Sequence, residues 1–121
     1  MSHTIHSYQQ GGAEWHAHRA SHFNASEAPA MMGASKYTTR AELLREKATG
    51  VQREHDAATQ RRFAAGHEAE AHVRARIEQM TGDDFFPVTA SRVVDGLPLS
   101  ASYDGLTMDE TTGLEVKLWN E

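Results

Sequence analysis

The chain has 121 residues, of which 39% are hydrophobic and 24% are charged, a balance typical of one small folded domain. It contains no cysteine, which excludes disulfides, thiolate metal sites and cysteine nucleophiles. No apolar run approaches about 18 residues, the minimum for a membrane span, and the polar start lacks a signal-peptide core. We therefore expect a cytoplasmic protein that does not contact a membrane.

The net charge of −5 is unevenly distributed along the chain. Residues 1–76 carry ten Lys/Arg, eight Asp/Glu and all eight histidines, so their formal charge is +2. Residues 77–121 carry two Lys/Arg and nine Asp/Glu, so their charge is −7. This asymmetry is compatible with phosphate contacts in the first region and a carboxylate site in the second, or with an uneven but solvated surface.

Helical periodicity and capping residues predict four helices in the first two thirds of the chain. They are Ala13–Ala20, a short helix from a Ser26 cap to Met32, a helix between Thr39 and Gly50, and a long helix from about Asp56 to Thr81. The Met31–Met32 pair is interpreted as core. Glycines that follow the predicted helices provide natural C-terminal stops.

After Gly82 the apolar pattern changes from helical to alternating, which predicts strands. We expect them at Phe85–Phe86, Val93–Val94, Leu97–Leu106 and Gly113–Trp119, with a hairpin turn at Asp95–Gly96. Helices followed by a small, mainly antiparallel sheet predict an α+β fold with the N-terminal helices packed on the sheet.

One carboxylate of the long helix falls on its predicted buried stripe, which comprises Gly66, Glu70, Val73, Ile77 and Met80. Glu68 lies about 200° away around the helix. A buried carboxylate is unfavourable unless a metal, an arginine or a proton compensates for its charge. Glu70 is therefore a candidate site residue, although a helix-boundary glutamate that reaches solvent would show the same spacing.

Two of the predicted strands carry further polar groups. Strand alternation places Ser100, Ser102 and Asp104 on one face. In the following strand, Glu115 and Lys117 share a face. Taken alone, Asp104 could belong to a turn. Taken alone, Glu115 and Lys117 could be an exposed charge pair. Together with Glu70, they form an oxygen-ligand set suited to Mg²⁺ or Mn²⁺ beside an amine, which is a combination that can hydrolyse phosphodiesters.

These residues carry a resemblance to a known family. Glu70, Asp104 and Glu115-Val116-Lys117 resemble the PD-(D/E)XK nuclease signature. More narrowly, an ordered set of segments resembles the lambda-exonuclease/YqaJ-like phage recombinase family. The segments are Gln10 with Glu14-Trp15-His16-Ala17-His18-Arg19, Asn24-Ala25-Ser26, Gly33 with Tyr37 and Thr39-Arg40, Gly66-His67-Glu68-Ala69-Glu70, Ser100-Ala101-Ser102-Tyr103-Asp104-Gly105-Leu106, and Gly113-Leu114-Glu115-Val116-Lys117.

The resemblance implies one restriction-endonuclease-like domain over residues 1–121 and a Mg²⁺- or Mn²⁺-dependent exonuclease. Such enzymes digest linear duplex DNA from the 5′ end for phage homologous recombination, beside a single-strand annealing protein and in some cases as homo-oligomers. By position, Asp104, Glu115, the Val116 carbonyl and Glu70 would hold the metal, and Lys117 would be the catalytic lysine. The resemblance also implies that Arg19, Ser26 and Ser102 hold the terminal 5′-phosphate. An arginine fork and hydroxyl donors suit a phosphate dianion.

The chain departs from the family pattern after Lys117. Family members continue with a further helix and strand, which carry another phosphate-pocket arginine and an active-site polar residue. We therefore expect a fragment, a shortened gene product or a chain whose remainder a partner supplies. The resemblance implies a bacterial, phage or prophage gene. Two other hypotheses follow from the departure: an inactive remnant that binds DNA ends or a recombination partner, and an interaction module that dimerises through an exposed sheet edge.

Other polar residues of the first region are open to more than one interpretation. His18 and His22 could share a zinc site on a helix, whereas His16 and His18 could not. Trp15 is expected to anchor the first helix near the phosphate-binding end. Arg61, Arg62, Arg74 and Arg76 could contact the DNA backbone or form a solvated helix face with ordinary ion pairs.

Overall fold

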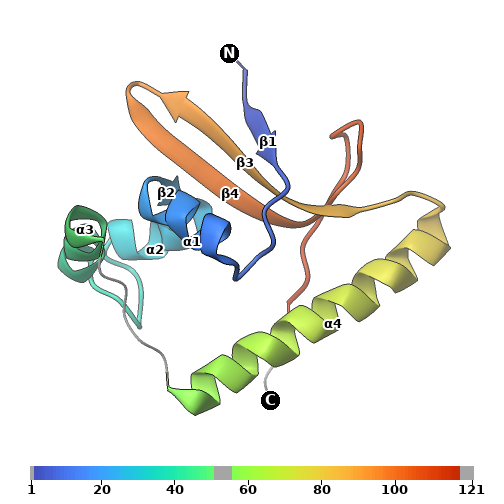
Figure 1. Cartoon of the computed structure of the whole chain (residues 1–121), viewed down its shortest axis with the longest axis horizontal. Helices are drawn as coiled ribbons and strands as arrows, with labels where there is room; N and C mark the ends of the chain where they lie inside the picture. The colour runs from blue at the N-terminus through green and yellow to red at the C-terminus, as the bar shows by residue number, and fades with distance from the viewer. Residues whose placement is uncertain (1, 51–55, 118–121) are drawn as a thin grey trace. The chain divides into compact units, whose positions relative to one another are not determined.

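The computed structural model describes residues 2–50 and 56–117. The elements in chain order are β1 (Thr4–His6), α1 (Ala13–Ala20), β2 (Phe23–Asn24), a 3₁₀ turn (Ala25–Glu27), α2 (Ala28–Met31), α3 (Arg40–Thr49), α4 (Ala57–Thr81), β3 (Phe86–Val94), β4 (Leu97–Leu106) and β5 (Gly113–Leu114) (Figure 1). Helices occupy most of the chain before residue 82 and a mainly antiparallel sheet follows. The predicted α+β class is therefore confirmed.

Two compact units are formed from alternating stretches of the sequence. The first unit comprises Met1–Arg53 and Thr89–Ser102, and the second comprises Glu54–Val88 and Tyr103–Glu121. Strands β3 and β4 contribute residues to both units. The single-domain organisation expected from the sequence stays a prediction.

The sheet of the first unit has the strand order β1-β3-β4-β2. Strand β1 pairs antiparallel with β3, with Ile5 opposite Ala90, and β2 pairs parallel with β4, with Phe23 opposite Leu99. Neither β1 nor β2 is predicted from the sequence. Both are very short, so their pairing depends on tertiary contacts rather than on an alternating pattern of their own.

The turn between β3 and β4 adopts the predicted hairpin conformation. Asp95 and Gly96 both have positive φ, at 51° and 79°. Two successive residues with positive φ are the requirement of a type I′ turn, whose twist matches that of the flanking strands. This turn joins β3 and β4 in the sequence, and β4 carries Ser102 and Asp104.

Most predicted helix boundaries are confirmed, with one correction at an N-terminal cap. Helix α1 has the predicted bounds, and α3 begins after Thr39, whose side chain accepts a hydrogen bond from the Glu42 amide. Ser26, however, lies inside the 3₁₀ turn and does not cap it. Asn24 is the cap, and it forms a capping box with Glu27. The Asn24 side chain bonds to the Glu27 backbone, and the Glu27 carboxylate accepts a hydrogen bond from the Asn24 backbone amide.

In the second unit, α4 begins after the Asp56 cap and ends at Gly82 in the left-handed conformation, as the sequence predicts. Strand β5 pairs antiparallel with the end of β4, with Gly105 opposite Leu114. The strand predicted over Gly113–Trp119 is shorter in the structure, which ends it at Leu114. Leu118 and Trp119 lie outside the described residues.

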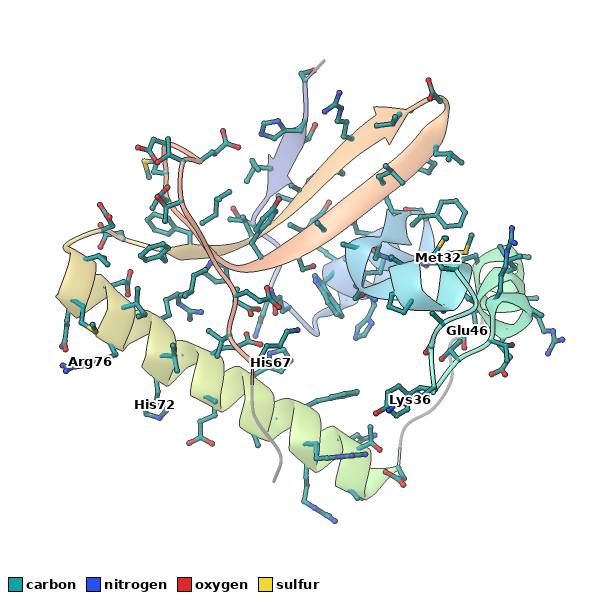
Figure 2. The ribbon with its side chains drawn as sticks, turned by 180° about the vertical axis from the view of Figure 1, so that it is seen from behind. Met32, Lys36, Glu46, His67, His72 and Arg76 are labelled. Carbon is teal, nitrogen blue, oxygen red and sulfur yellow. The ribbon has the colours of Figure 1, made fainter. Side chains whose placement is uncertain are left out.

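The buried apolar side chains of the described residues are few: Ala30 and Leu43 in the first unit, and Phe85 and Val88 in the second. The core interpretation of Met32 is wrong, because its side chain (labelled in Figure 2) is 81% exposed. The predicted apolar stripe of α4 is also corrected, since Val73 and Met80 are exposed. Among the described residues, no helix has the length and apolar character needed to cross a membrane.

Candidate functional site

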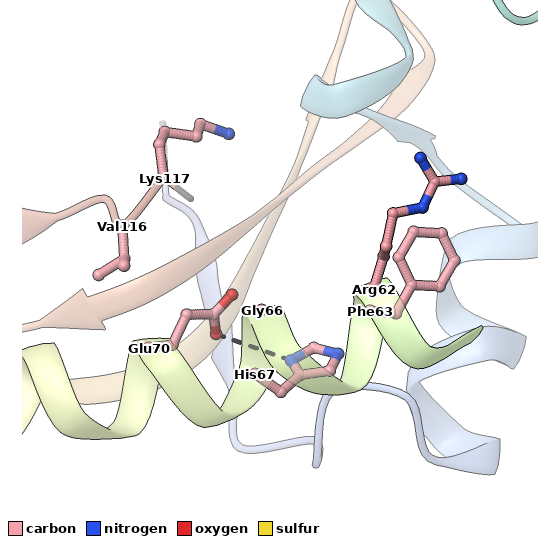
Figure 3. Close-up of a pocket in the computed structure, with 7 residues that line it drawn as sticks. All are labelled: Arg62, Phe63, Gly66, His67, Glu70, Val116 and Lys117. Atoms are coloured by element: carbon pink, nitrogen blue, oxygen red, sulfur yellow. Dashed lines mark ion pairs between the residues drawn. The ribbon is translucent and has the colours of Figure 1, made fainter. Parts of the chain in front are cut away.

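Glu70 of α4 is a partly buried carboxylate beside a second one, Asp104 of β4. Its side chain is 20% exposed. Burial raises the pKa of Glu70, and the negative charge of Asp104 raises it further, whereas His67 and Arg74 act in the opposite direction. The Nδ1 atom of His67 lies 3.7 Å from Glu70 Oε2 (Figure 3). Two neighbouring carboxylates in such a setting favour a bound cation or proton.

Asp104 is a buried carboxylate whose orientation is set by a backbone donor. Its Oδ2 atom accepts a hydrogen bond from the Val116 amide at 2.7 Å. The guanidinium of Arg74 donates to the Asp104 backbone carbonyl at 3.2 Å, which connects α4 with β4 inside the second unit. The bond from Val116 also explains why β5 is short. The sequence pattern predicts that the Val116 amide bonds to a neighbouring strand, but in the structure it bonds to the Asp104 side chain.

Gly105, the residue after Asp104, allows β4 to pass close to its neighbours. A Cβ atom added here would lie 2.9 Å from the Phe85 Cβ atom and 3.2 Å from the Leu114 Cβ atom. The first distance is shorter than real Cβ contacts allow. A side chain at this position would therefore displace the strand that carries Asp104.

Glu115 and Lys117 form an ion pair with each other rather than with the other site residues. The Lys117 Nζ atom lies 2.9 Å from Glu115 Oε1, and the side chains are 76% and 59% exposed. The hydrogen bond and the charge of Glu115 raise the pKa of Lys117 and so favour its charged form. Within residues 2–50 and 56–117, no three carboxylate or histidine side chains converge as a metal-binding group.

The donor set therefore fits a divalent cation only in part. Glu70 and Asp104 lie close enough for the charge of one to raise the pKa of the other, and both are largely shielded from solvent. These are suitable oxygen ligands for a hard cation. Glu115, the third expected ligand, is exposed and paired with Lys117. The structure thus brings two of the three expected carboxylates together.

A cavity of about 230 Å³ in the second unit contains Glu70 and Lys117. Its lining residues are Arg62, Phe63, Gly66, His67, Glu70, Val116 and Lys117 (Figure 3). Phe63 is missed by the sequence analysis, and His67 has no role there beyond its place in the segment that resembles the family. Their spacing of four and then three residues before Glu70 places them on one side of α4, so the helical period could have identified them.

In the first unit, Arg19 lies near the end of α1, and its guanidinium contacts the side chains of Ser26 and Trp15. Its Nη2 atom donates a hydrogen bond to Ser26 Oγ at 3.2 Å, and its guanidinium lies 4.8 Å from the centre of the Trp15 ring. Burial lowers the pKa of Arg19, and the charge of Glu27 opposes this effect. A stacked guanidinium keeps its planar donors aligned for an anion.

Trp15 connects Arg19 to Ser102 of β4. The indole Nε1 atom donates to Ser102 Oγ at 3.1 Å, and this hydroxyl lies 3.4 Å from Thr89 Oγ1. The structure therefore brings together the three residues expected to hold a 5′-phosphate, although they come from α1, the 3₁₀ turn and β4. We refer to Arg19, Ser26, Ser102 and Trp15 as the Arg19 cluster.

Comparison with known families identifies the chain. Residues 14–121 match the YqaJ-like viral recombinase domain. The chain belongs to this family. The match includes every candidate residue named above, from Arg19 to Lys117, and connects the chain with phage-type recombination nucleases. No curated protein is significantly similar to the chain.

Three of the histidines, His6, His18 and His22, form a ring cluster with Tyr8 beside the Arg19 cluster. The rings of His18 and His22 stack with their centres 3.9 Å apart, and those of His6 and Tyr8 lie 4.8 Å and 5.3 Å from His18. Burial lowers the pKa of His18, as do the neighbouring His22 and His6. The spacing of His18 and His22 predicts this proximity, but the described residues contain no three-ligand group for zinc.

Proposed function

We propose that this YqaJ-like domain is a divalent-metal-dependent nuclease that digests one strand of linear duplex DNA from a 5′-phosphorylated end. The observation that supports the proposal most directly is the Arg19 cluster. A stacked arginine and two serine hydroxyls from separate segments provide a fork of N–H donors and two O–H donors. This combination suits the charge and oxygen geometry of a terminal phosphate.

The cation would be Mg²⁺ or Mn²⁺, held by Asp104 and Glu70 and completed by Glu115 and the Val116 carbonyl. When bound, it would stabilise negative charge on a phosphate oxygen and lower the pKa of an attacking water. Val116 already contacts Asp104 through its amide, so Glu115 is one residue away from the carboxylate pair. Reorientation of the exposed Glu115 side chain would add the third ligand.

Lys117 would act near the same carboxylates. Its amine would orient or deprotonate the attacking water and offset the negative charge of the carboxylates. The cavity beside it offers Arg62 as a further cation and the exposed ring of Phe63. These features would accommodate part of a nucleotide next to Glu70.

The wider setting of this activity is also a proposal. Membership of a viral recombinase family supports DNA ends as the substrate, a single-strand annealing protein as a partner and self-association as a way of assembling the enzyme. It likewise supports a phage or prophage gene expressed in a bacterial cytoplasm.

The test is digestion of a 5′-phosphorylated linear duplex in Mg²⁺, with EDTA and the Glu115→Ala variant as negative controls. Glu68→Ala serves as a matched control, because the side chain of Glu68 is 78% exposed on the same unit. We expect metal-dependent loss of one strand in the wild type and in Glu68→Ala only. Absence of turnover by folded wild-type protein would contradict the proposed activity.

An inactive domain that binds DNA ends is the second candidate function. It is favoured by one difference: the Arg19 cluster is assembled by contacts among its own side chains, whereas the Glu115 side chain is exposed and paired with Lys117. Such a protein would bind 5′-phosphorylated ends without digesting them. Its affinity would survive removal of Asp104 and Glu115.

A further inference from the structure

Lys47, close to the end of α3, contacts two groups beside the Arg19 cluster. Its ammonium group lies 3.0 Å from Glu27 Oε2 and donates a hydrogen bond to the backbone carbonyl of Arg19. The side chains of Lys47 and Glu27 are only 15% and 16% exposed. Because water competes weakly in such a setting, this pair constrains its partners more than a surface pair would.

Both oxygens of Glu27 are engaged by groups other than Arg19. Oε1 accepts hydrogen bonds from the backbone amide and the side-chain amide of Asn24, at 2.8 Å and 2.9 Å. Oε2 faces Lys47, and the Arg19 Nη2 atom lies 4.0 Å away from it, at the limit of an ion pair. Arg19 therefore keeps a positive charge that Glu27 does not neutralise at close range.

We propose that Lys47 is a positioning residue for recognition of a 5′-phosphate, a role that rests on the function proposed above. By binding Glu27, Lys47 prevents this carboxylate from closing onto the Arg19 guanidinium. Without Lys47, Glu27 could move closer to Arg19 than its present 4.0 Å and would compete with the phosphate for the same donors. Lys47 does not contact the phosphate in this proposal.

The hydrogen bond to the Arg19 carbonyl gives Lys47 a second way to position this residue. Arg19 is the penultimate residue of α1, and its carbonyl also accepts hydrogen bonds from the Asn24 side chain at 3.0 Å and the His22 amide at 3.3 Å. A cation is favourable at the end of a helix, where carbonyls lack partners within the helix. Lys47 thus holds the backbone of Arg19 as well as its nearest anion.

The experiment compares the binding of two duplexes that differ only in a 5′-phosphate or a 5′-hydroxyl. Fluorescence anisotropy in EDTA prevents cleavage from altering the result. We expect Lys47→Met to lower the preference for the phosphate about tenfold, because Glu27 would then occupy one of the charge-assisted donors of Arg19. Lys47→Arg should keep the preference. The double variant Lys47→Met/Glu27→Gln should recover most of it, because the competing carboxylate is gone.

The outcomes separate this inference from the proposed function. A wild-type protein without phosphate preference would contradict the phosphate site itself, and with it the role of Lys47. A wild-type preference that Lys47→Met retains would contradict the role of Lys47 alone. If thermal unfolding shows that Lys47→Met is not folded, the double variant decides the question. Loss of the 5′-phosphate preference in a folded double variant would contradict the proposal. The reason is that Glu27→Gln would not rescue the loss of a lysine whose role is purely structural.

Discussion

The Arg19 cluster of the first unit is joined by its own side chains, whereas the carboxylates of the second unit are only partly assembled. Arginine, serine and tryptophan satisfy one another through a hydrogen bond, a ring contact and a further hydrogen bond. Three carboxylates cannot do the same, because each added negative charge disfavours the next. Glu115 is instead paired with the nearby ammonium of Lys117.

This difference separates a binding function from a chemical one. The fold can preorganise a cationic cluster that has neutral donors. Its side chains then move little when an anion binds. A carboxylate site for a divalent cation depends on the cation for its final arrangement. We therefore expect variants in the two units to have separable effects, on end recognition in one and on turnover in the other.

The largest effect is expected from Asp104→Asn. The amide can still accept the hydrogen bond from Val116, so the protein should fold, but the buried charge is removed. We expect the rate of metal-dependent digestion to fall by about 10²- to 10³-fold, while 5′-phosphorylated ends remain bound. Digestion rate and end affinity are measured side by side, with Glu68→Gln as the control. An equal loss of end affinity would remove the distinction between the two units.

A smaller effect is expected from Arg19→Lys, which keeps the charge and removes the planar fork. The preference for a 5′-phosphate over a 5′-hydroxyl should fall about tenfold, because one ammonium cannot replace a bidentate donor. Arg45→Lys, at an exposed position of α3, is the matched control. Competition binding provides the measurement. If the two variants behaved alike, the stacked guanidinium would have no special role in recognition.

The smallest effect concerns pH and the histidine rings beside the Arg19 cluster. Burial, His22 and His6 lower the pKa of His18 below its ordinary value of 6.5, so the folded state binds fewer protons than the unfolded state. The free energy of unfolding should therefore decrease as the pH falls below about 6.5. Urea unfolding at several pH values checks this. His18→Gln should flatten the dependence, whereas exposed His72→Gln should not.

The helices and the hairpin follow from local signals in the sequence. Thr39 and Gly50 delimit α3, Asp56 and Gly82 delimit α4, and Asp95 supports the tight turn with Gly96. These residues act on the backbone within a few positions, so their effect is visible in one sequence. The first unit's short strands are not predictable in this way, because only their partners make them strands.

The candidate site is predictable in its residue types and less so in its contacts. Strand alternation and helical period identify Asp104 and Glu70, and the structure brings these two together. The alternation around Glu115 also predicts a longer strand, but the Val116 amide bonds to Asp104 instead. Which donor satisfies a carboxylate is a tertiary property, and a sequence pattern does not contain it.

Gly105 has a consequence for anyone who surveys this chain by random mutagenesis. Every replacement adds at least a Cβ atom. Even the Cβ atom of alanine would lie 2.9 Å from the Phe85 Cβ atom and 3.2 Å from the Leu114 Cβ atom. In a saturation scan, every substitution of Gly105 should therefore be deleterious. A nucleophile or a metal ligand would give the same pattern. Intolerance here would report a lack of space next to Asp104, not a reactive group.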